Sequence, residues 1–548
     1  MRDAFVASGA GFAITTANKV TPWLDGQAAA WQQARSDACL NTTIHKVWSA
    51  DTFGRSLWCL DGHRMEMESL MAEFGRADIT TVQQAVPAVA SLGSVRRCLD
   101  VGYLHSQSVS LTEGRERVQA LRADLSRARA LGLAGKYAEG LALATSTRVR
   151  AQMLDWRPLV VTARYHEGSL LRGTAAYHKA EEALREAYFE AVRLGLWDLA
   201  VDAATVLSVV VGYDLPRHAE GRTWAEHAAA NAAHASDPEG LREADRLNNL
   251  AMVVSSAGSY PEALALHQRA LTLREEALGS DHPAVARSLN NLAIVRASTG
   301  ELEAARALFA RAVAIKEKTL GADHPDFAQS LGNLAMATAD SGDTASAEVL
   351  FRRTIAVLEQ AAGHDDPNVA TTSIALADLL RKKGEYAEAR SLNERALAIY
   401  EKAFGVDHPD VASALINLAN VHLATGSYDA ARGLFERAVT ILEKWLGPKH
   451  PELALALNNL AVVHVTTGRP VEALPLIERA LKIYDLEAGE QVGESDAHFT
   501  LAQALVDSGR DRARAVAEIE KARDGYRSFG DGRAQELAAL DLWVKEHL

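Results

Sequence analysis

Four histidines recur at matching places in the chain, each directly before a proline: His282, His324, His408 and His450. Histidine is a common zinc ligand, so a regularly spaced set raises the question of metal binding. The spacing of 42 residues or twice that number assigns them to separate helix pairs. Neighbouring pairs stack about 10 Å apart, which is too far for equivalent side chains to share one ion through bonds of about 2 Å. We therefore interpret them as loop and helix-capping residues and expect no metal.

The other short motifs that could indicate catalysis or nucleotide binding match their consensus patterns poorly. Gly132–Tyr137 reads GLAGKY, but a phosphate-binding loop needs a glycine where Ala130 stands and a hydroxyl residue where Tyr137 stands. The segment instead matches the turn at 384–388, so we interpret it as a repeat turn. No serine, cysteine or carboxylate stands beside a histidine in a recognised nucleophile setting. We expect no catalytic residues, no cofactor and no enzyme.

Asparagines form the remaining pattern, because they recur in successive helices one position before a leucine. They are Asn249, Asn291, Asn333, Asn417 and Asn459, and Ala375 interrupts the series. Asparagine is a mediocre helix former, so its repeated use inside helices needs a reason. Each amide could bond the neighbouring repeat and fix the stacking, or the amides could line a concave face and bond a bound peptide backbone.

These residues are positioned by a 42-residue repeat. Its turn glycines are Gly258, Gly300, Gly342, Gly384, Gly426 and Gly468. Small residues follow at a fixed place, namely Ala263, Ala305, Ala347, Ala389, Ala431 and Ala473. Within one unit, Pro283 begins a first helix, Asp281 is expected to cap it, and Gly300 ends it. Such a period predicts antiparallel helix pairs stacked into one continuous right-handed superhelix over 242–490.

This pattern resembles the tetratricopeptide repeat. More narrowly, "SLNNLAIV" and "GEYAEARSLNERALAIYEKAFGVDHPD" resemble kinesin-light-chain-type repeats. The resemblance implies an all-α tetratricopeptide-repeat solenoid, with the asparagines on its concave face in contact with a peptide. Their expected neighbours in the groove are Arg287, Asn290, Arg381, Lys382, Asn420 and Asn458. Carboxylate-clamp members need clustered basic residues, and these are few here, so we expect a peptide held by backbone bonds and shallow apolar pockets.

The N-terminal part resembles a second family. "WQQARSDACL" at 31–40, "SLWCLDGHRMEMESLM" at 56–71 and "AVPAVASLGSVRRCLDVGYL" at 85–104 resemble the segment that joins kinase to repeats in large bacterial serine/threonine kinases. The kinase motifs themselves, a glycine-rich loop, HRD and DFG, do not occur. The resemblance implies the regulatory, non-kinase half of such a signalling system, working with a kinase partner.

Composition and charge limit the classes of partner that the chain can bind. The formal net charge is −13 and the pI is near 5.8, which disfavours nucleic acid and anionic lipid. No apolar run is long enough to span a bilayer, and Met1–Val20 is not a convincing signal peptide. We expect a cytoplasmic protein, or an extracytoplasmic one if it derives from an anchored kinase. The three cysteines are then expected to be thiols, with a disulfide only outside the cytosol.

The predicted organisation has four parts. They are a helical head at 1–110 with Cys39, Cys59 and Cys98, degenerate helix pairs at 111–240, six strict repeats at 241–490, and a last pair with a capping helix at 491–548. Solenoids present long concave surfaces and are mostly binders. The sequence therefore predicts a non-catalytic scaffold for a protein or peptide ligand; the alternative is the kinase-associated role.

Overall fold

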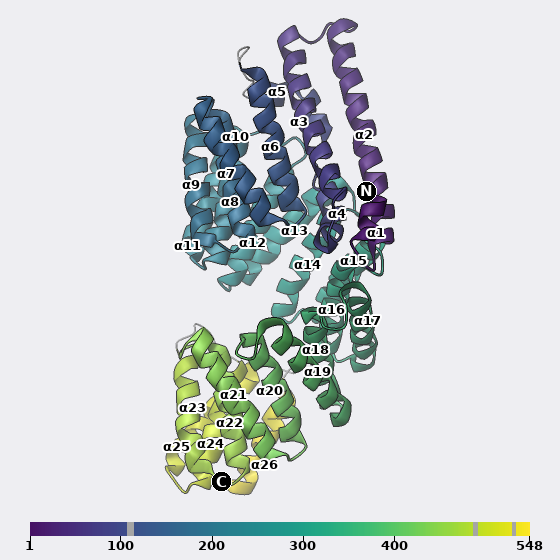
Figure 1. Ribbon diagram of the computed structural model, residues 1–548. Helices are drawn as coiled ribbons and strands as arrows, with labels where there is room; N and C mark the ends of the chain where they lie inside the picture. The colour runs from purple at the N-terminus through teal and green to yellow at the C-terminus, as the bar shows by residue number, and fades with distance from the viewer. Residues whose placement is uncertain (107–113, 486–491, 529–532) are drawn as a thin grey trace. The chain divides into compact units, whose positions relative to one another are not determined.

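The computed structural model describes residues 1–106, 114–485, 492–528 and 533–548, which form helices and no strand (Figure 1). The chain divides into two compact units, Met1–Ala362 and Gly363–Leu548. None of the described helices is long and apolar enough to cross a membrane. The head and the first repeats belong to the first unit, and the remaining repeats form the second.

The head is built around one apolar core. Its elements are α1 (Arg2–Ala7), α2 (Ala13–Thr43), α3 (Ala50–Phe74), α4 (Ile79–Ala90), the 3₁₀ helix η1 (Val95–Leu99) and α5 (Val101–Ser106). Phe5 of α1 meets Phe74 of α3 edge to face, with ring centroids 5.5 Å apart. Ser49 and Asp78 cap α3 and α4 by accepting backbone N–H bonds, as short polar residues do at helix starts.

A disulfide joins Cys59 of α3 to Cys98 of η1, whereas Cys39 is free and exposed. The expectation that these cysteines are thiols is therefore wrong for two of the three. The chain brings the pair together because η1 lies against α3, where Ser56 Oγ donates to the Cys98 carbonyl over 2.7 Å. The two Cα atoms are 5.5 Å apart, within the range that a disulfide needs.

Degenerate helix pairs follow the head in the first unit. They are α6 (Arg115–Leu133), α7 (Tyr137–Met153), α8 (Arg157–Gly173), α9 (Tyr177–Arg193), α10 (Trp197–Val209), the π-helical turn η2 (Val210–Asp214) and α11 (His218–Ala232). The GLAGKY segment forms the turn between α6 and α7, which confirms its interpretation as a repeat turn. Gly212 and Gly221 let η2 and α11 approach closely, since a Cβ on Gly221 would lie 2.3 Å from the Gly212 Cα.

The strict repeats start at α12 and continue into the second unit. In the first unit they are α12 (Leu241–Ser256), α13 (Tyr260–Leu278), α14 (Pro283–Ser298), α15 (Leu302–Thr319), α16 (Pro325–Asp340) and α17 (Thr344–Ala362). In the second unit they are α18 (Pro367–Lys382), α19 (Tyr386–Phe404), α20 (Pro409–Ala424), α21 (Tyr428–Leu446), α22 (Pro451–Thr466) and α23 (Pro470–Tyr484). The chain closes with α24 (Val492–Asp507), α25 (Arg512–Ser528) and α26 (Ala534–His547). All six fixed alanines are fully buried, as a close helix crossing requires.

The loop histidines cap the first helices of their repeats. His282 Nδ1 accepts the Ala284 N–H over 3.1 Å, and the other three histidines accept the equivalent bond. This confirms their predicted capping role. The expectation that Asp281 caps α14 is wrong, because the histidine occupies the capping position and Asp281 pairs instead with Lys318.

The boundary between the units falls inside the strict array, where the periodicity predicts a continuous superhelix. The sequence departs from the repeat at this point. Asp366 stands in the capping position that histidine fills in the four His-Pro repeats. Ala375 interrupts the recurring series of Asn249, Asn291, Asn333, Asn417 and Asn459, which we call the ladder asparagines. In the preceding repeat, Asn290 Oδ1 accepts a hydrogen bond from the ladder residue Asn333. Gly332 stands at the position equivalent to Asn290 and has no side chain to accept such a bond. The boundary therefore coincides with the junction between two strict repeats at which both the donor and the acceptor of this bond are missing.

Candidate functional site

The head is docked on the loops of the strict repeats within the first unit. Thr15 Oγ1 of α2 donates to Asp323 Oδ2 over 2.7 Å, and Gln83 Nε2 of α4 donates to Asp326 Oδ1 over 2.9 Å. These partners lie about 300 and 240 residues apart in the sequence. The head is therefore not an independent appendage, because it covers part of the repeats.

Aromatic contacts extend this docking to two of the capping histidines. The Phe12 ring meets His324 with centroids 5.0 Å apart, and Trp23 meets His282 at 5.2 Å. Leu320, at the end of α15, belongs to the apolar core of the head. His282 and His324 thus have two roles, since one ring nitrogen caps a helix while the ring packs against the head.

A cavity of about 1120 Å³ lies between the docked head and the repeats, and we call it the groove. Its head side comes from α2, α4 and the segment before η1, and includes Trp23. Its repeat side comes chiefly from α13, α14 and α16. Three of the predicted site residues, Arg287, Asn290 and Asn333, line it together. This part of the predicted concave face is therefore a shaped, partly enclosed site.

On the repeat side of the groove, two cations have no carboxylate partner within the described residues. Arg274 is buried and pairs with Asp245, Nη2 to Oδ1, over 2.6 Å. Arg287 makes no hydrogen bond or ion pair within the described residues, and surrounding protein together with nearby Arg274 lowers its pKa. Lys316 Nζ reaches only the carbonyl oxygen of Asp326, at 3.0 Å, and burial lowers its pKa. Because the Arg287 side chain is exposed and Lys316 is half-buried, an incoming anion can reach both cations and form charge-assisted hydrogen bonds with them.

Two ladder asparagines of the first unit bond the preceding repeat. Asn291 Nδ2 donates to Asn248 Oδ1 over 3.1 Å, and Asn333 Nδ2 donates to Asn290 Oδ1 over 2.8 Å. These bonds supply the stacking role that the pattern suggests. An amide has two donor hydrogens and two acceptor lone pairs, so the same groups can also bond a peptide. Peptide contact by the ladder stays a prediction.

The remaining ladder asparagines find different acceptors. Asn249 Nδ2 donates to the Thr205 carbonyl over 3.1 Å. In the second unit, Asn459 Nδ2 lies 3.4 Å from Asn420 Oδ1. Asn417 turns to its own helix, where it donates to the Ser413 carbonyl over 2.9 Å. The residue that would accept its bond in the preceding repeat is isoleucine, which has no polar side-chain atom.

The other predicted groove residues belong to the second unit, so they do not share the cavity. Arg381 and Lys382 both pair with Asp378, at 2.7 and 2.9 Å, which offsets their charge. Asn458 is buried, and its Oδ1 has no hydrogen-bond partner within the described residues. The predicted site residues are therefore divided between the two units, and the groove includes three of those in the first unit.

Sequence reasoning missed Arg274 and Lys316, which lie on second helices rather than first ones. A signal was available, because the two residues occupy the same repeat position, 42 residues apart, where later repeats have Leu358 and Tyr400. A basic residue at an otherwise apolar position indicates a local role. The contribution of Trp23 was not visible in the sequence, since it depends on docking of the head.

Comparison with known proteins agrees with this architecture. The tetratricopeptide repeat family model matches residues 242–318, 296–360, 326–402, 368–444 and 410–486. Residues 242–486 of the chain are therefore tetratricopeptide repeats. A search of curated proteins finds no significant match.

Several solved structures are similar over parts of the chain. A Podosopora anserina protein described as kinesin light chain with nearly identical TPR-like repeats is 27% identical, with 38% of this chain and 98% of that one covered and a TM-score of 0.34. BtubC (BKLC) from P. vanneervenii is 23% identical over 42% of this chain and 92% of its own, with a TM-score of 0.37. A Rap protein complexed with competence and sporulation factor is 15% identical over 68% and 99%, with a TM-score of 0.45.

Proposed function

We propose that this protein is a non-catalytic scaffold that binds a peptide segment of a partner protein in the groove between its head and its repeats. The observation that supports this most is the pair of cations, Arg287 and Lys316, which line the groove without a carboxylate partner in the described residues. Arg287 is exposed to the groove and Lys316 is half-buried, so an anionic group can reach both and form a charge-assisted hydrogen bond with each. The favoured ligand is therefore a peptide with an acidic side chain.

The shape of the groove also favours a peptide. Its volume of about 1120 Å³ exceeds what a small metabolite needs and accommodates several residues of extended chain. Asn290 and Asn333 offer amide groups on the repeat side, and Trp23 offers an apolar surface on the head side. A peptide would exchange backbone bonds with the amides while an apolar side chain packs on the indole.

The experiment is selection of peptides from a random library on the full chain, followed by affinity measurement. We expect acidic residues to be enriched and Arg287→Gln to weaken the selected peptides at least about tenfold, as loss of a charge-assisted bond predicts. Arg381→Gln is the matched control, because this arginine is already paired with Asp378 in the other unit. Equal affinities for the two variants would contradict the proposal.

A role beside a serine/threonine kinase stays a prediction. It depends on the resemblance of the three head segments, while the family match covers only the repeats. A gene for a kinase domain next to this one, and phosphorylation of a bound partner by that kinase, would support it. A gene neighbourhood without a kinase would count against it.

The disulfide favours the extracytoplasmic alternative for localisation. Disulfides persist mainly in oxidising compartments, whereas cytosolic thiols are kept reduced. The Cys59–Cys98 bond joins two elements of the head, so we propose that the head matures outside the cytosol. Fractionation of the native cell with a thiol-alkylation readout tests this, and a fully reduced cytosolic protein would refute it.

A further inference from the structure

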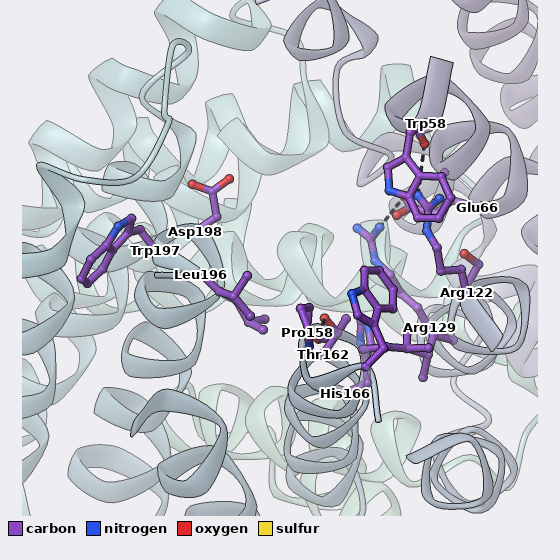
Figure 2. A pocket seen from close by; sticks show the side chains of 16 residues that line it. Trp58, Glu66, Arg122, Arg129, Pro158, Thr162, His166, Leu196, Trp197 and Asp198 are labelled. Atoms are coloured by element: carbon purple, nitrogen blue, oxygen red, sulfur yellow. Dashed lines mark hydrogen bonds and ion pairs between the residues drawn. The ribbon is translucent and has the colours of Figure 1, made fainter. Parts of the chain in front are cut away.

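A second, smaller cavity lies between the head and the degenerate repeats (Figure 2). Its volume is about 260 Å³, and its walls come from α3, α6, α8 and the start of α10, all in the first unit. It shares no lining residue with the groove. A protein cavity of about 150 Å³ is enough to hold benzene, so this one accommodates an organic molecule of one or two rings.

The apolar part of the wall is aromatic. Trp58 is 6% exposed and meets Trp156 edge to face, with ring centroids 6.4 Å apart. Leu159 also lines the cavity, and Leu196 lies across it from Trp58 (Figure 2). The two indoles meet at a steep angle and form an aromatic corner of the cavity wall, against which a flat apolar body can pack.

A guanidinium group is built into the same wall. Arg122 lies over the Trp58 ring at 3.9 Å from its centroid, and its Nη2 donates to the Trp58 carbonyl over 3.2 Å. Its Nη1 is buried and has no hydrogen-bond partner within the described residues. Gly62 on α3 makes room for this arrangement, because a Cβ there would lie 2.6 Å from Nη2. Burial lowers the pKa of Arg122 to about 10.

The other charged groups of the wall already have partners. Arg129 pairs with Glu66 at 2.5 Å. Asp198 accepts the Ser236 N–H at 2.9 Å and lies 3.4 Å from Arg242. Within the described residues, Arg122 is therefore the lining cation without a carboxylate partner.

We propose that this cavity binds a small organic anion, a monocarboxylate with a flat apolar body of one or two rings. Its carboxylate pairs with Arg122, and its body packs in the corner of Trp58 and Trp156, opposite Leu196. A planar guanidinium favours a carboxylate through charge-assisted hydrogen bonds. A cationic ligand would instead be repelled by Arg122, since both carboxylates of the wall are already paired.

The test uses the full chain and three probes of the same shape. Sodium 2-naphthoate is negative, 2-naphthamide is neutral and 2-naphthylmethylammonium is positive. Titration calorimetry, with tryptophan fluorescence as a second readout, should show saturable binding of naphthoate at least about tenfold tighter than naphthamide, and no binding of the cation. Equal binding of the three probes, or no saturable naphthoate binding, would overturn the proposal.

A matched pair of variants locates the anion. Arg122→Gln should remove the preference for naphthoate over naphthamide. Arg115→Gln should keep it, because Arg115 also lies over the Trp58 ring, at 5.4 Å, but does not line the cavity. Circular dichroism checks that both variants are folded. If Arg122→Gln does not fold, the comparison of the three probes on the unaltered chain still decides the proposal.

Discussion

Removing the side chain of Asn333 and removing that of Asn417 should have opposite effects on stability. Asn333 bonds the preceding repeat through Asn290, at 2.8 Å, whereas Asn417 bonds only its own helix, through the Ser413 carbonyl. Asn333→Ala loses a bond between repeats, which is worth about 0.5–1.5 kcal/mol net. Alanine is the better helix former by up to about 0.7 kcal/mol, which offsets part of that loss. The net change is a destabilisation of about 0.5 kcal/mol.

Asn417→Ala is the control with the reverse expectation. Its side chain competes for the carbonyl of its own helix and links no repeats, so the helix gains about 0.5 kcal/mol from the alanine. A double variant, Asn291→Ala with Asn333→Ala, should lose about 1 kcal/mol, because both bonds join repeats. Asn333 and Asn417 belong to different units. For each variant, the stability of the helix that carries the substitution is therefore compared with that of the same helix in the unaltered chain.

The assay is hydrogen exchange read by mass spectrometry, because a chain of two units does not unfold in one step. Exchange in α16 should speed up about twofold in the single variant and about fivefold in the double variant, since 1.4 kcal/mol corresponds to tenfold. Exchange in α20 of Asn417→Ala should slow slightly. Changes in the same direction for Asn333→Ala and Asn417→Ala would refute the stacking role.

Three further predictions concern the head and the caps. Gly11→Ala should release the head from the repeats, because the new Cβ would lie 2.6 Å from the Gln360 carbonyl oxygen. Gly54→Ala in α3 is the control, because a Cβ there meets nothing within 4 Å. Limited proteolysis should cleave the first variant faster than the second. His282 has its pKa lowered to about 4, chiefly by burial, so the unfolded chain binds more protons and stability should fall as pH drops from 6.5 towards 4. His282→Asn should make the melting temperature depend less steeply on pH in this range. An unchanged dependence would contradict the lowered pKa of His282. Alkylation before and after reduction should label one and then three cysteines, with Cys39 the first; three at the outset would mean that the disulfide is absent.

Much of the repeat geometry could be predicted because its determinants are local. Proline at the first helical position and glycine after the last one fix the bounds of helices such as Pro283–Ser298. The fixed alanines are buried for the steric reason that their size suggests. The pattern also predicts the C-terminal helices, since the expected last pair and capping helix correspond to α24, α25 and α26.

What could not be predicted depends on contacts between distant parts of the chain. The docking of Trp23 on His282 joins residues more than 250 positions apart, and no periodicity encodes it. The Cys59–Cys98 bond depends likewise on how η1 lies against α3. The groove combines Arg287 of a first helix with Lys316 of a second helix and with the head, so repeat pattern alone gave only part of its lining.

The most direct test of the groove is a hydrogen-exchange footprint of a library-selected acidic peptide on the full chain. If the peptide lies between head and repeats, protection should appear together in α2, α4, α14 and α16, and Arg287→Gln should abolish it at the same peptide concentration. Protection restricted to helices of the second unit, or unaffected by Arg287→Gln, would contradict the account.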